Sequence, residues 1–492
     1  MKKVVIIGGG IAGMTAGVLL QKAGFKTEIY EKNALPGGQC TGWRREGYFI
    51  DNCIHWLTGT RPGSALHELW KEIGALGDDV ELYKKEMFFS SKLNGQTLTF
   101  WRDKERTRRE MLVLSPEDEK EINRLMDYVT LAETMTVPVE KPFDAMNLID
   151  FVKLGMSMKS MGKVMKEYGN MDINELAMRF KHPLIRRAIV DYMPRGYQAY
   201  AFLVSYATVT GGNGDIPKGG SLAMSLRIAE KYKEYGGEIH TNAGVEKIIL
   251  NGGKAQGILL QNGKEVDADY VVCACDTDYT FRNLLPEKYM PKGLKEMYVN
   301  REKYPVSSGL QIAYAVEDVF SELTGTRVFA CRELKVGTQA VQSMSIQAYD
   351  YEPDFAPEGK MILQSNFSQA EEDYQYWESL YQDQAAYKAR KVEIAEQAME
   401  RVITEYPFLD GKIRVLDVWS PMTYTRYCNS YKGAYMSFVT TQQAKSITVP
   451  GVIKGIDNVF LASQWLMGPG GLPTAAAMGR FAAWRIMKRK QS

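Results

Sequence analysis

The first 31 residues constrain the fold of this chain more than any other stretch. The β-forming residues 4–7 lead into the pattern Gly8-x-Gly10-x-x-Gly13, and an apolar, helix-like stretch follows it. A second strand-like run then ends on Glu31, about twenty positions after the glycines. This order of strand, glycine turn, helix, strand and acid predicts a unit that binds a dinucleotide.

Each residue of this pattern has a physical role. Gly8 permits the tight turn out of the strand, Gly10 lets a pyrophosphate approach the backbone, and Gly13 lets the helix pack close to the strand. The helix N-terminus would present its free N–H groups to the phosphates. Glu31 would accept hydrogen bonds from a ribose hydroxyl, which disfavours NADP but does not separate NAD from FAD.

Length and composition limit the number of domains and the kinds of partner that we expect. With 492 residues it is too long for one ordinary core, so we expect two or more domains. A net charge of +2 gives no reason to expect a nucleic acid partner. The six scattered cysteines and four histidines show no metal-ligand spacing, so we expect no metal site and reduced cysteines in the cytoplasm. No apolar stretch is long enough to span a membrane.

Residues 145–168 form a segment rich in Met and Lys within a mostly helical region. Such a helix could rest peripherally on a membrane surface or cover a lipid-like substrate. A cap helix with a solvated lysine face explains the same pattern, and the sequence leaves both interpretations open.

Polar and glycine-rich segments recur after buried-type strands. Residues 35–38 (Leu-Pro-Gly-Gly) suggest a second close approach of backbone to a ligand, and the strand-like residues 48–51 lead on to His55. Runs from Val245 onward, joined by Asn-Gly turns, predict a β-meander. Later strand-like runs at 308–316, 344–348 and 360–366 indicate a second sheet.

The last seventy residues repeat the strand–glycine loop–helix order. Tyrosines at 424, 427, 431 and 435 form an aromatic loop that could wall a flat ring or pack in an interface. The strand-like residues 457–462 lead into a Gly-Pro-rich loop at 468–473 and then a helix. The N-terminus of that helix could stabilise negative charge on a bound ring or phosphate.

Together these motifs resemble the FAD-binding oxidoreductases of the glutathione reductase-like superfamily. More narrowly, the chain is similar to the phytoene desaturase, carotenoid isomerase and retinol saturase group, also through residues 217–220 and 271–276. The resemblance implies an α/β fold, with a Rossmann-like FAD-binding domain and an inserted mixed α+β substrate domain. The FAD-binding domain would comprise residues 1–65, 215–295 and 425–492, and the substrate or cap domain residues 66–214 and 296–424.

The resemblance also implies a noncovalent FAD. Val245 would meet the adenine through its backbone, Asp457 the ribityl or phosphate side, and the amides of residues 472–475 the flavin N1 and O2. The full set of expected cofactor-binding residues is Gly8, Gly10, Ala12, Gly13, Glu31, Lys32, Gly37, Gly38, Gln39, Val245, Asp276, Gly433, Asp457, Gly470, Gly471, Leu472 and Ala475.

Two positions depart from the resemblance. Many relatives carry an arginine after the paired glycines, where this chain has Gln39 and Cys40, although Arg44 or Arg45 could serve instead. Cys428 could be proposed as a covalent flavin attachment, as in some amine oxidases, but its neighbouring sequence does not match theirs.

The implied function is a flavoenzyme that desaturates, saturates or isomerises carbon–carbon bonds of a hydrophobic, isoprenoid or polyene-like substrate. In such enzymes the flavin exchanges a hydride equivalent and the protein orients and stabilises charge. His55, Asp51 and Tyr431 are the catalytic candidates. The sequence identifies neither the direction of reaction, nor the electron acceptor, nor the oligomeric state.

Two other interpretations stay open. A flavin amine oxidase would need an aromatic cage and a lysine-held water, for which Tyr431 and Lys432 are available. A non-enzymatic prenyl- or lipid-binding protein of the GDP-dissociation-inhibitor type would be colourless, and both enzymes would be yellow.

Overall fold

The strand that precedes the glycine motif lies in the middle of a six-stranded sheet. The computed structural model describes residues 1–193, 196–439 and 441–491. Within them the first five strands of this sheet run parallel and the last is antiparallel. The strand order is β10 (Glu238–His240), β2 (Lys26–Tyr30), β1 (Lys3–Ile7), β14 (Tyr270–Cys273), β21 (Ile456–Leu461), β20 (Val452–Ile453). This is the parallel arrangement that the glycine motif predicts.

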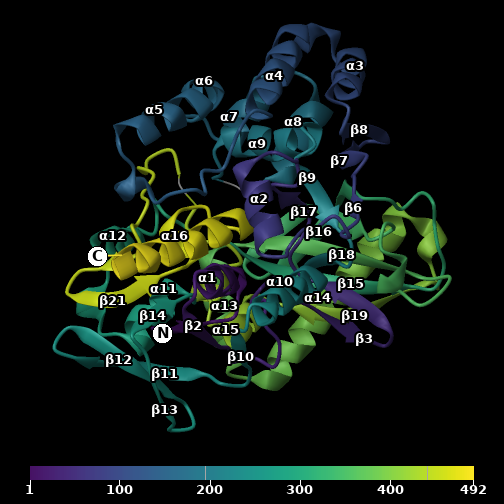
Figure 1. Ribbon diagram of the computed structural model, residues 1–492. Coiled ribbons are helices and arrows are strands. Elements are labelled where there is room, and N and C mark those ends of the chain that lie inside the picture. The colour runs from purple at the N-terminus through teal and green to yellow at the C-terminus, as the bar shows by residue number, and fades with distance from the viewer. Residues whose placement is uncertain (194–195, 440, 492) are drawn as a thin grey trace.

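Helix α1 (Ile11–Lys22) packs between α10 (Gly220–Glu234) and α16 (Leu472–Gln491) (Figure 1). Its first ten residues are buried, which explains why apolar and small side chains occur all round the helix. Small residues also set the spacing to α16, because a Cβ at Gly479 would lie 2.3 Å from the Ala12 carbonyl oxygen. The two termini of the chain therefore meet in one layer.

The predicted β-meander is confirmed as a separate three-stranded antiparallel sheet. It consists of β11 (Val245–Asn251), β12 (Lys254–Leu260) and β13 (Glu265–Asp267). It returns the chain to β14, and therefore places Val245 near the carboxyl ends of the parallel strands.

A seven-stranded sheet forms the second part of the molecule. Its order is β19 (Ile413–Trp419), β15 (Ser308–Val316), β18 (Met361–Gln369), β17 (Gln339–Ala348), β16 (Thr326–Val336), β7 (Met87–Leu93), β8 (Gln96–Trp101). Helices α13 (Glu371–Tyr381) and α14 (Gln384–Glu405) share a hydrophobic core with it. The sequence predicted β15, β17 and β18, and did not predict β7, β16 or β19.

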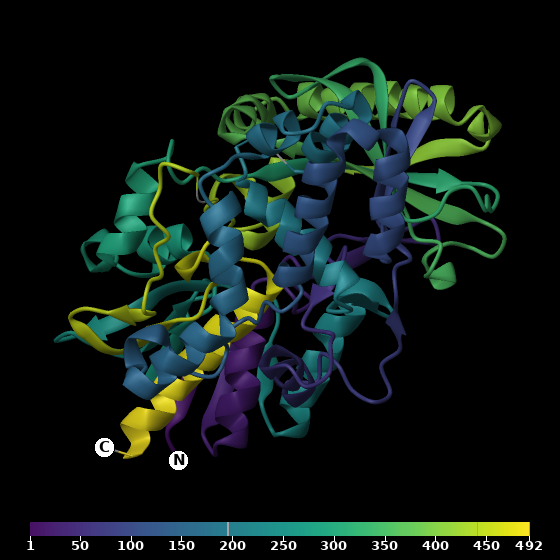
Figure 2. The ribbon, with the colours of Figure 1, turned by 90° about the horizontal axis from the view of Figure 1, so that it is seen from above.

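A group of helices, here called the cap, forms a third part of the molecule and has its own hydrophobic core (Figures 1 and 2). Helix α8 joins the cap to the seven-stranded sheet through contacts with β7, β8 and β16. The cap helices are α3 (Lys104–Leu114), α4 (Glu119–Ala132), α5 (Leu148–Ser157), α6 (Lys159–Tyr168), α7 (Ile173–Met178), α8 (Pro183–Tyr192) and α9 (Ala199–Thr210).

Short elements connect these parts. The hairpin of β3 (Gly42–Arg45) and β4 (Tyr48–Asp51) packs its aromatic residues against the seven-stranded sheet. The remaining elements are α2 (Ala65–Glu72), β5 (Leu57–Thr58), β6 (Leu82–Tyr83), β9 (Gly214–Pro217), α11 (Thr277–Tyr279), α12 (Lys292–Val299) and α15 (Pro421–Cys428).

Each of the two large sheets takes its strands from the segments that were expected to form one domain. All strands of the six-stranded sheet fall within residues 1–65, 215–295 and 425–492, and those of the seven-stranded sheet within 66–214 and 296–424. The exact boundaries need correction, because each of the four falls inside an element: 65/66 in α2, 214/215 in β9, 295/296 in α12 and 424/425 in α15. In the described ranges no helix is both long and apolar enough to cross a bilayer.

Candidate active site

One continuous cavity of about 2050 Å³ runs from the glycine motif to the cap helices. Its walls come from the six-stranded sheet, the seven-stranded sheet and the cap together. Ordinary small-molecule pockets measure roughly 300–1,000 Å³. The cavity therefore has room for a dinucleotide and a large second molecule.

The glycine motif forms one end of the cavity. Gly8 has a φ of +105°, which supports the sharp turn out of β1. A Cβ at Gly10 would meet nothing within 4 Å, so this position opens on the cavity. Helix α1 begins there without any side-chain cap. Bare backbone and an uncapped helix N-terminus suit the pyrophosphate of a dinucleotide.

Glu31 is held in a fixed orientation where β2 ends. Its Oε2 accepts a hydrogen bond from the Gly9 N–H at 2.8 Å, and its Oε1 accepts from the Asn33 N–H at 2.9 Å. Glu31, Ala12 and Lys32 all line the cavity. The Lys32 ammonium donates to the Arg426 carbonyl at 2.9 Å, which ties this wall to the end of α15.

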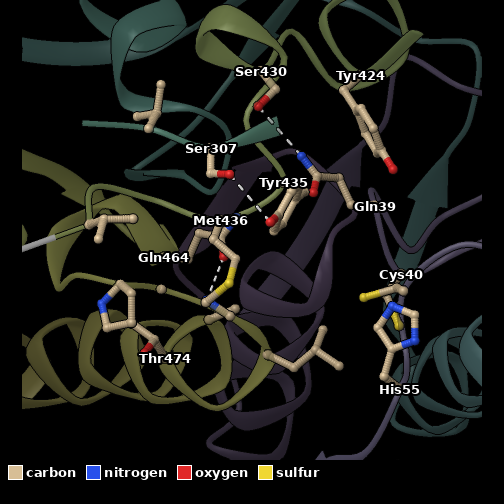
Figure 3. A pocket seen from close by; sticks show the side chains of 18 of the residues that line it. Gln39, Cys40, His55, Ser307, Tyr424, Ser430, Tyr435, Met436, Gln464 and Thr474 are labelled. Carbon is tan, nitrogen blue, oxygen red and sulfur yellow. Dashed lines mark hydrogen bonds between the residues drawn. The ribbon is translucent and has the colours of Figure 1, made fainter. Parts of the chain in front are cut away.

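The segment after Glu31 returns to the glycine motif and lines the cavity with Gly37 and Gly38. The Gly37 N–H donates to the Gly9 carbonyl at 2.8 Å, and Gly37 and Gly38 both have positive φ. The Gln39 side chain donates to the Ala434 carbonyl at 2.9 Å and also contacts Ser430 (Figure 3). Gln39 thus binds the protein's own loop in the place where many relatives carry an arginine.

Segments from residue 245 onward form another wall of the cavity. Val245, Asp276, Gly470, Gly471, Leu472 and Ala475 line it. Burial raises the pKa of Asp276 to about 7, although the Tyr431 and Asp278 N–H groups donate to it. The Gln464 Oε1 accepts from the Gly471 N–H at 2.7 Å (Figure 3). Gln464 follows β21, and sequence reasoning missed it.

The predicted contact of Asp457 with the cofactor needs correction, because Asp457 does not line the cavity. It is the second residue of β21, is exposed, and so lies at the amino end of the strand. Ligands in parallel sheets bind at the carboxyl ends of the strands. The residues that leave β21 into the cavity are instead Ser463 and Gln464.

Two expected glycine contacts are also positions of internal packing. A Cβ at Gly13 would lie 2.0 Å from the Gly8 carbonyl oxygen, so Gly13 keeps α1 close to β1, as predicted, but does not line the cavity. Gly433 has a φ of +64°, and a Cβ there would lie 2.3 Å from the Pro421 carbonyl oxygen. Gly433 shapes the turn after α15, outside the cavity lining.

Two of the three catalytic candidates lie outside the cavity lining. Asp51 is fully buried and accepts a hydrogen bond from the Ser221 N–H at 2.6 Å, so it fixes the start of α10. The Tyr431 ring packs against Tyr298, with ring centroids 5.0 Å apart. Both residues therefore contribute to the structure around the cavity and do not face it.

His55 lines the cavity opposite Thr474 and Gln464 (Figure 3). Burial, with a smaller effect of the nearby Lys85 charge, lowers the pKa of His55 to about 4. The imidazole is therefore neutral at ordinary pH. Lys85 also lines the cavity, and sequence reasoning missed it because the run Lys84-Lys85-Glu86 has the pattern of a solvated turn.

Cys428 lines the cavity as a protonated thiol. Burial raises its pKa to about 12. In the part of the chain that the structure describes, no cluster of three His, Cys, Asp or Glu side chains is placed to hold a metal ion.

Far from the glycine motif the cavity has two different walls. Its roof is largely apolar and aromatic, with Met158, Met161, Tyr197, Tyr200 and Val204 from the region of α6 and α9. The charged residues of α8 in this roof, Arg187 and Asp191, pair with each other at 2.7 Å. Its floor consists of amide and hydroxyl side chains on β15, β17 and β18, namely Gln311, Gln347, Gln364, Ser365 and Asn366.

Known proteins share this architecture. The chain is 26% identical to a lycopene-forming phytoene desaturase of Paracoccus over 293 residues, which is 58% of this chain and 56% of the relative. It is 23% identical to the chloroplastic prolycopene isomerase of Daucus carota, over 98% of this chain and 79% of the relative. An oxidoreductase from Methanosarcina mazei has the same fold, with a TM-score of 0.63 and 19% identity over 99% and 100% of the two chains.

The family model described as flavin containing amine oxidoreductase matches residues 11–487. The resemblance drawn from the motifs is thereby confirmed. Contact of each named residue with the cofactor stays a prediction. The chain belongs to the flavin containing amine oxidoreductase family and is a flavin-dependent oxidoreductase.

Proposed function

We propose that this protein holds a noncovalent FAD and acts on carbon–carbon bonds of a long, largely apolar, polyene or isoprenoid substrate. The observation that carries the proposal is the continuous cavity between the glycine motif and the Met- and Tyr-rich roof. The names of the relatives support it, since they describe a phytoene desaturase and a prolycopene isomerase. FAD fits better than a mononucleotide because the cavity includes both Glu31 and the start of α16.

Bound flavin supplies hydride exchange, and the chain's own residues orient the reactants and exclude water. The first turn of α16, with Leu472 and Ala475 in the cavity wall, places a helix N-terminus where negative charge is favoured. The neutral His55 and the protonated Cys428 add no charge to the cavity. The apolar roof keeps solvent from the reacting bond.

Anaerobic mixing of the holoprotein with candidate substrates tests the reaction class. Phytoene and a longer polyene are added in turn to oxidised and to chemically reduced enzyme, and benzylamine and putrescine serve as amine probes. We expect a polyene to change the flavin absorption and to leave a product of altered conjugation. Reduction of the flavin by an amine, with none of the polyenes reacting, would contradict the proposal.

The amine oxidase alternative has less structural support. Tyr431 lies outside the cavity lining, and the Lys432 ammonium forms an ion pair with Glu371. Tyr431 and Lys432, the residues named for an aromatic cage and a lysine-held water, therefore do not face the cavity, whereas Tyr424, Tyr427, Tyr435 and Lys85 do.

We also infer that helices α5 and α6 contact a membrane surface. No residue of α5 is buried, and five of its large apolar side chains are 51% to 80% exposed, namely Leu148, Ile149, Phe151, Val152 and Met156. Lys153, Lys159, Lys163 and Lys166 lie on the same helix pair. Exposed apolar side chains flanked by lysines suit an anionic bilayer.

The position of this helix pair supports the inference. Met158 and Met161 line the cavity from the same helix pair that carries the exposed apolar side chains of α5. Both acids of the segment form ion pairs with basic residues of the protein, since Asp150 pairs with Lys141 at 2.7 Å and Glu167 pairs with Arg179 at 2.9 Å. An apolar substrate could therefore pass from a bilayer directly into the cavity.

Sedimentation with vesicles tests this contact. The double variant Leu148→Ser, Phe151→Ser should lose most of its binding to phosphatidylglycerol vesicles, because each substitution removes exposed apolar area. Val113→Ser, at an 84% exposed position on α3, is the matched control. Equal binding of both variants, or no binding of the wild type, would overturn the inference.

A further inference from the structure

Lys85 places a buried ammonium group in the cavity wall. The residue lies in the loop between β6 and β7, is 4% exposed, and lines the cavity. Over residues 1–193, 196–439 and 441–491 the structure shows no ion pair or hydrogen bond to its ammonium. An unpaired buried charge is costly and is retained where a partner completes it.

The groups around Lys85 leave it open to a ligand. His55 lines the same cavity close enough for the Lys85 charge to affect its pKa, and it is neutral. Asp350 exerts a favourable charge effect on Lys85 from beyond salt-bridge distance, and its Oδ1 accepts the Gly325 N–H at 3.1 Å. The two residues that follow His55 in this wall, Trp56 and Leu57, are largely apolar. The cavity wall contains the carboxylates of Glu31, Asp191 and Asp276, and over the described residues no ion pair joins any of them to Lys85; Asp191 pairs with Arg187.

We propose that the Lys85 ammonium binds a carboxylate carried by an otherwise apolar substrate. The proposal deepens the proposed function, on which it rests for the apolar chain. The apolar roof would cover that chain, and Lys85 would fix its charged end and hence its register along the cavity. A single ammonium matches a single negative charge, whereas a diphosphate would require several donors or cations.

The experiment compares two ligands of equal chain length in the holoprotein. Palmitate and hexadecanol are titrated by calorimetry into wild type, Lys85→Met, Lys85→Arg and Lys84→Met. Lys84 is the exposed neighbour and provides the matched control. Wild type and Lys84→Met should bind palmitate at least tenfold more tightly than hexadecanol.

Lys85→Met should lose this preference without weaker binding of hexadecanol, and Lys85→Arg should keep most of it. In wild type the preference should fall as the pH rises from about 7 to above 9, because the lysine loses its proton. Equal affinities of wild type for the two ligands, or an unchanged preference in Lys85→Met, would overturn the subsite. Binding of neither ligand would instead contradict the apolar cavity of the proposed function.

Discussion

At the scale of single residues, Lys85 makes a prediction about stability. Burial lowers its pKa from 10.5 to about 8. The cost of holding the ammonium in the folded protein is therefore fully present below pH 8 and disappears as the pH rises to 10.5. Without ligand, Lys85→Met should raise the free energy of unfolding by about 2 kcal/mol near neutral pH, and by little at high pH.

Urea unfolding of wild type, Lys85→Met and Lys84→Met at both pH values measures this difference. Lys84→Met should leave the unfolding free energy unchanged, because that side chain is exposed. A Lys85→Met variant less stable than wild type at neutral pH would mean that Lys85 serves the fold, through Asp350, rather than a ligand.

Gly10 and Gly13 belong to one motif and should respond differently to alanine. A Cβ at Gly10 would enter open space in the cavity, so Gly10→Ala should keep the stability of the apoprotein and weaken FAD binding about tenfold or more. A Cβ at Gly13 would collide with the Gly8 backbone, so Gly13→Ala should cost about 3 kcal/mol of folding free energy. Thermal unfolding of apoprotein and FAD titration separate the two effects; equal loss of stability in both variants would contradict this assignment.

The sequence predicted those site residues whose role depends on local geometry. The turn at Gly8, the close packing at Gly13 and the acid at the end of β2 are all set within 31 residues. Asp457 was wrongly predicted to lie in the site, because the sequence does not show which end of β21 faces the cavity. Lys85 was missed because its burial comes from distant parts of the chain.

At the scale of elements, the contact of α16 with α1 gives the next prediction. Alanine is a better helix former than glycine by about 1 kcal/mol, so Gly479→Ala would be stabilising on propensity alone. Its Cβ would however lie 2.3 Å from the Ala12 carbonyl oxygen, and we expect a net loss of about 2 kcal/mol and weaker FAD binding.

Gly162→Ala in α6 is the matched control for this helix substitution. A Cβ there would meet nothing within 4 Å, so propensity should dominate and stability should rise slightly. Chemical denaturation of both variants provides the comparison. A Gly479→Ala protein as stable as Gly162→Ala would show that α16 can move away from α1 without cost.

Strand prediction succeeded where the side chains are mostly apolar and buried. β15 is buried along its whole length and was predicted within its true bounds. β16 carries Arg, Glu and Lys among its buried residues, and β19 alternates half-buried polar and apolar positions. Such strands are stabilised by their neighbours in the sheet, and that information is not local.

At the scale of the whole molecule, the cavity exists only because three separately folded regions meet. The six-stranded sheet supplies the glycine motif, the seven-stranded sheet the polar floor, and the cap the apolar roof. The sequence could predict the first region from its motif and the overall architecture from resemblance. The pairing of a polar floor with an apolar roof became visible only in three dimensions.

The most direct test of the central claim is the near-ultraviolet and visible absorption spectrum of the purified protein, before and after acid precipitation. The account predicts flavin bands that move entirely into the acid supernatant, where the released molecule has the mass of FAD. Flavin retained in the pellet would contradict noncovalent binding and point to Cys428. A colourless protein that stays colourless after incubation with FAD would contradict the proposed function itself.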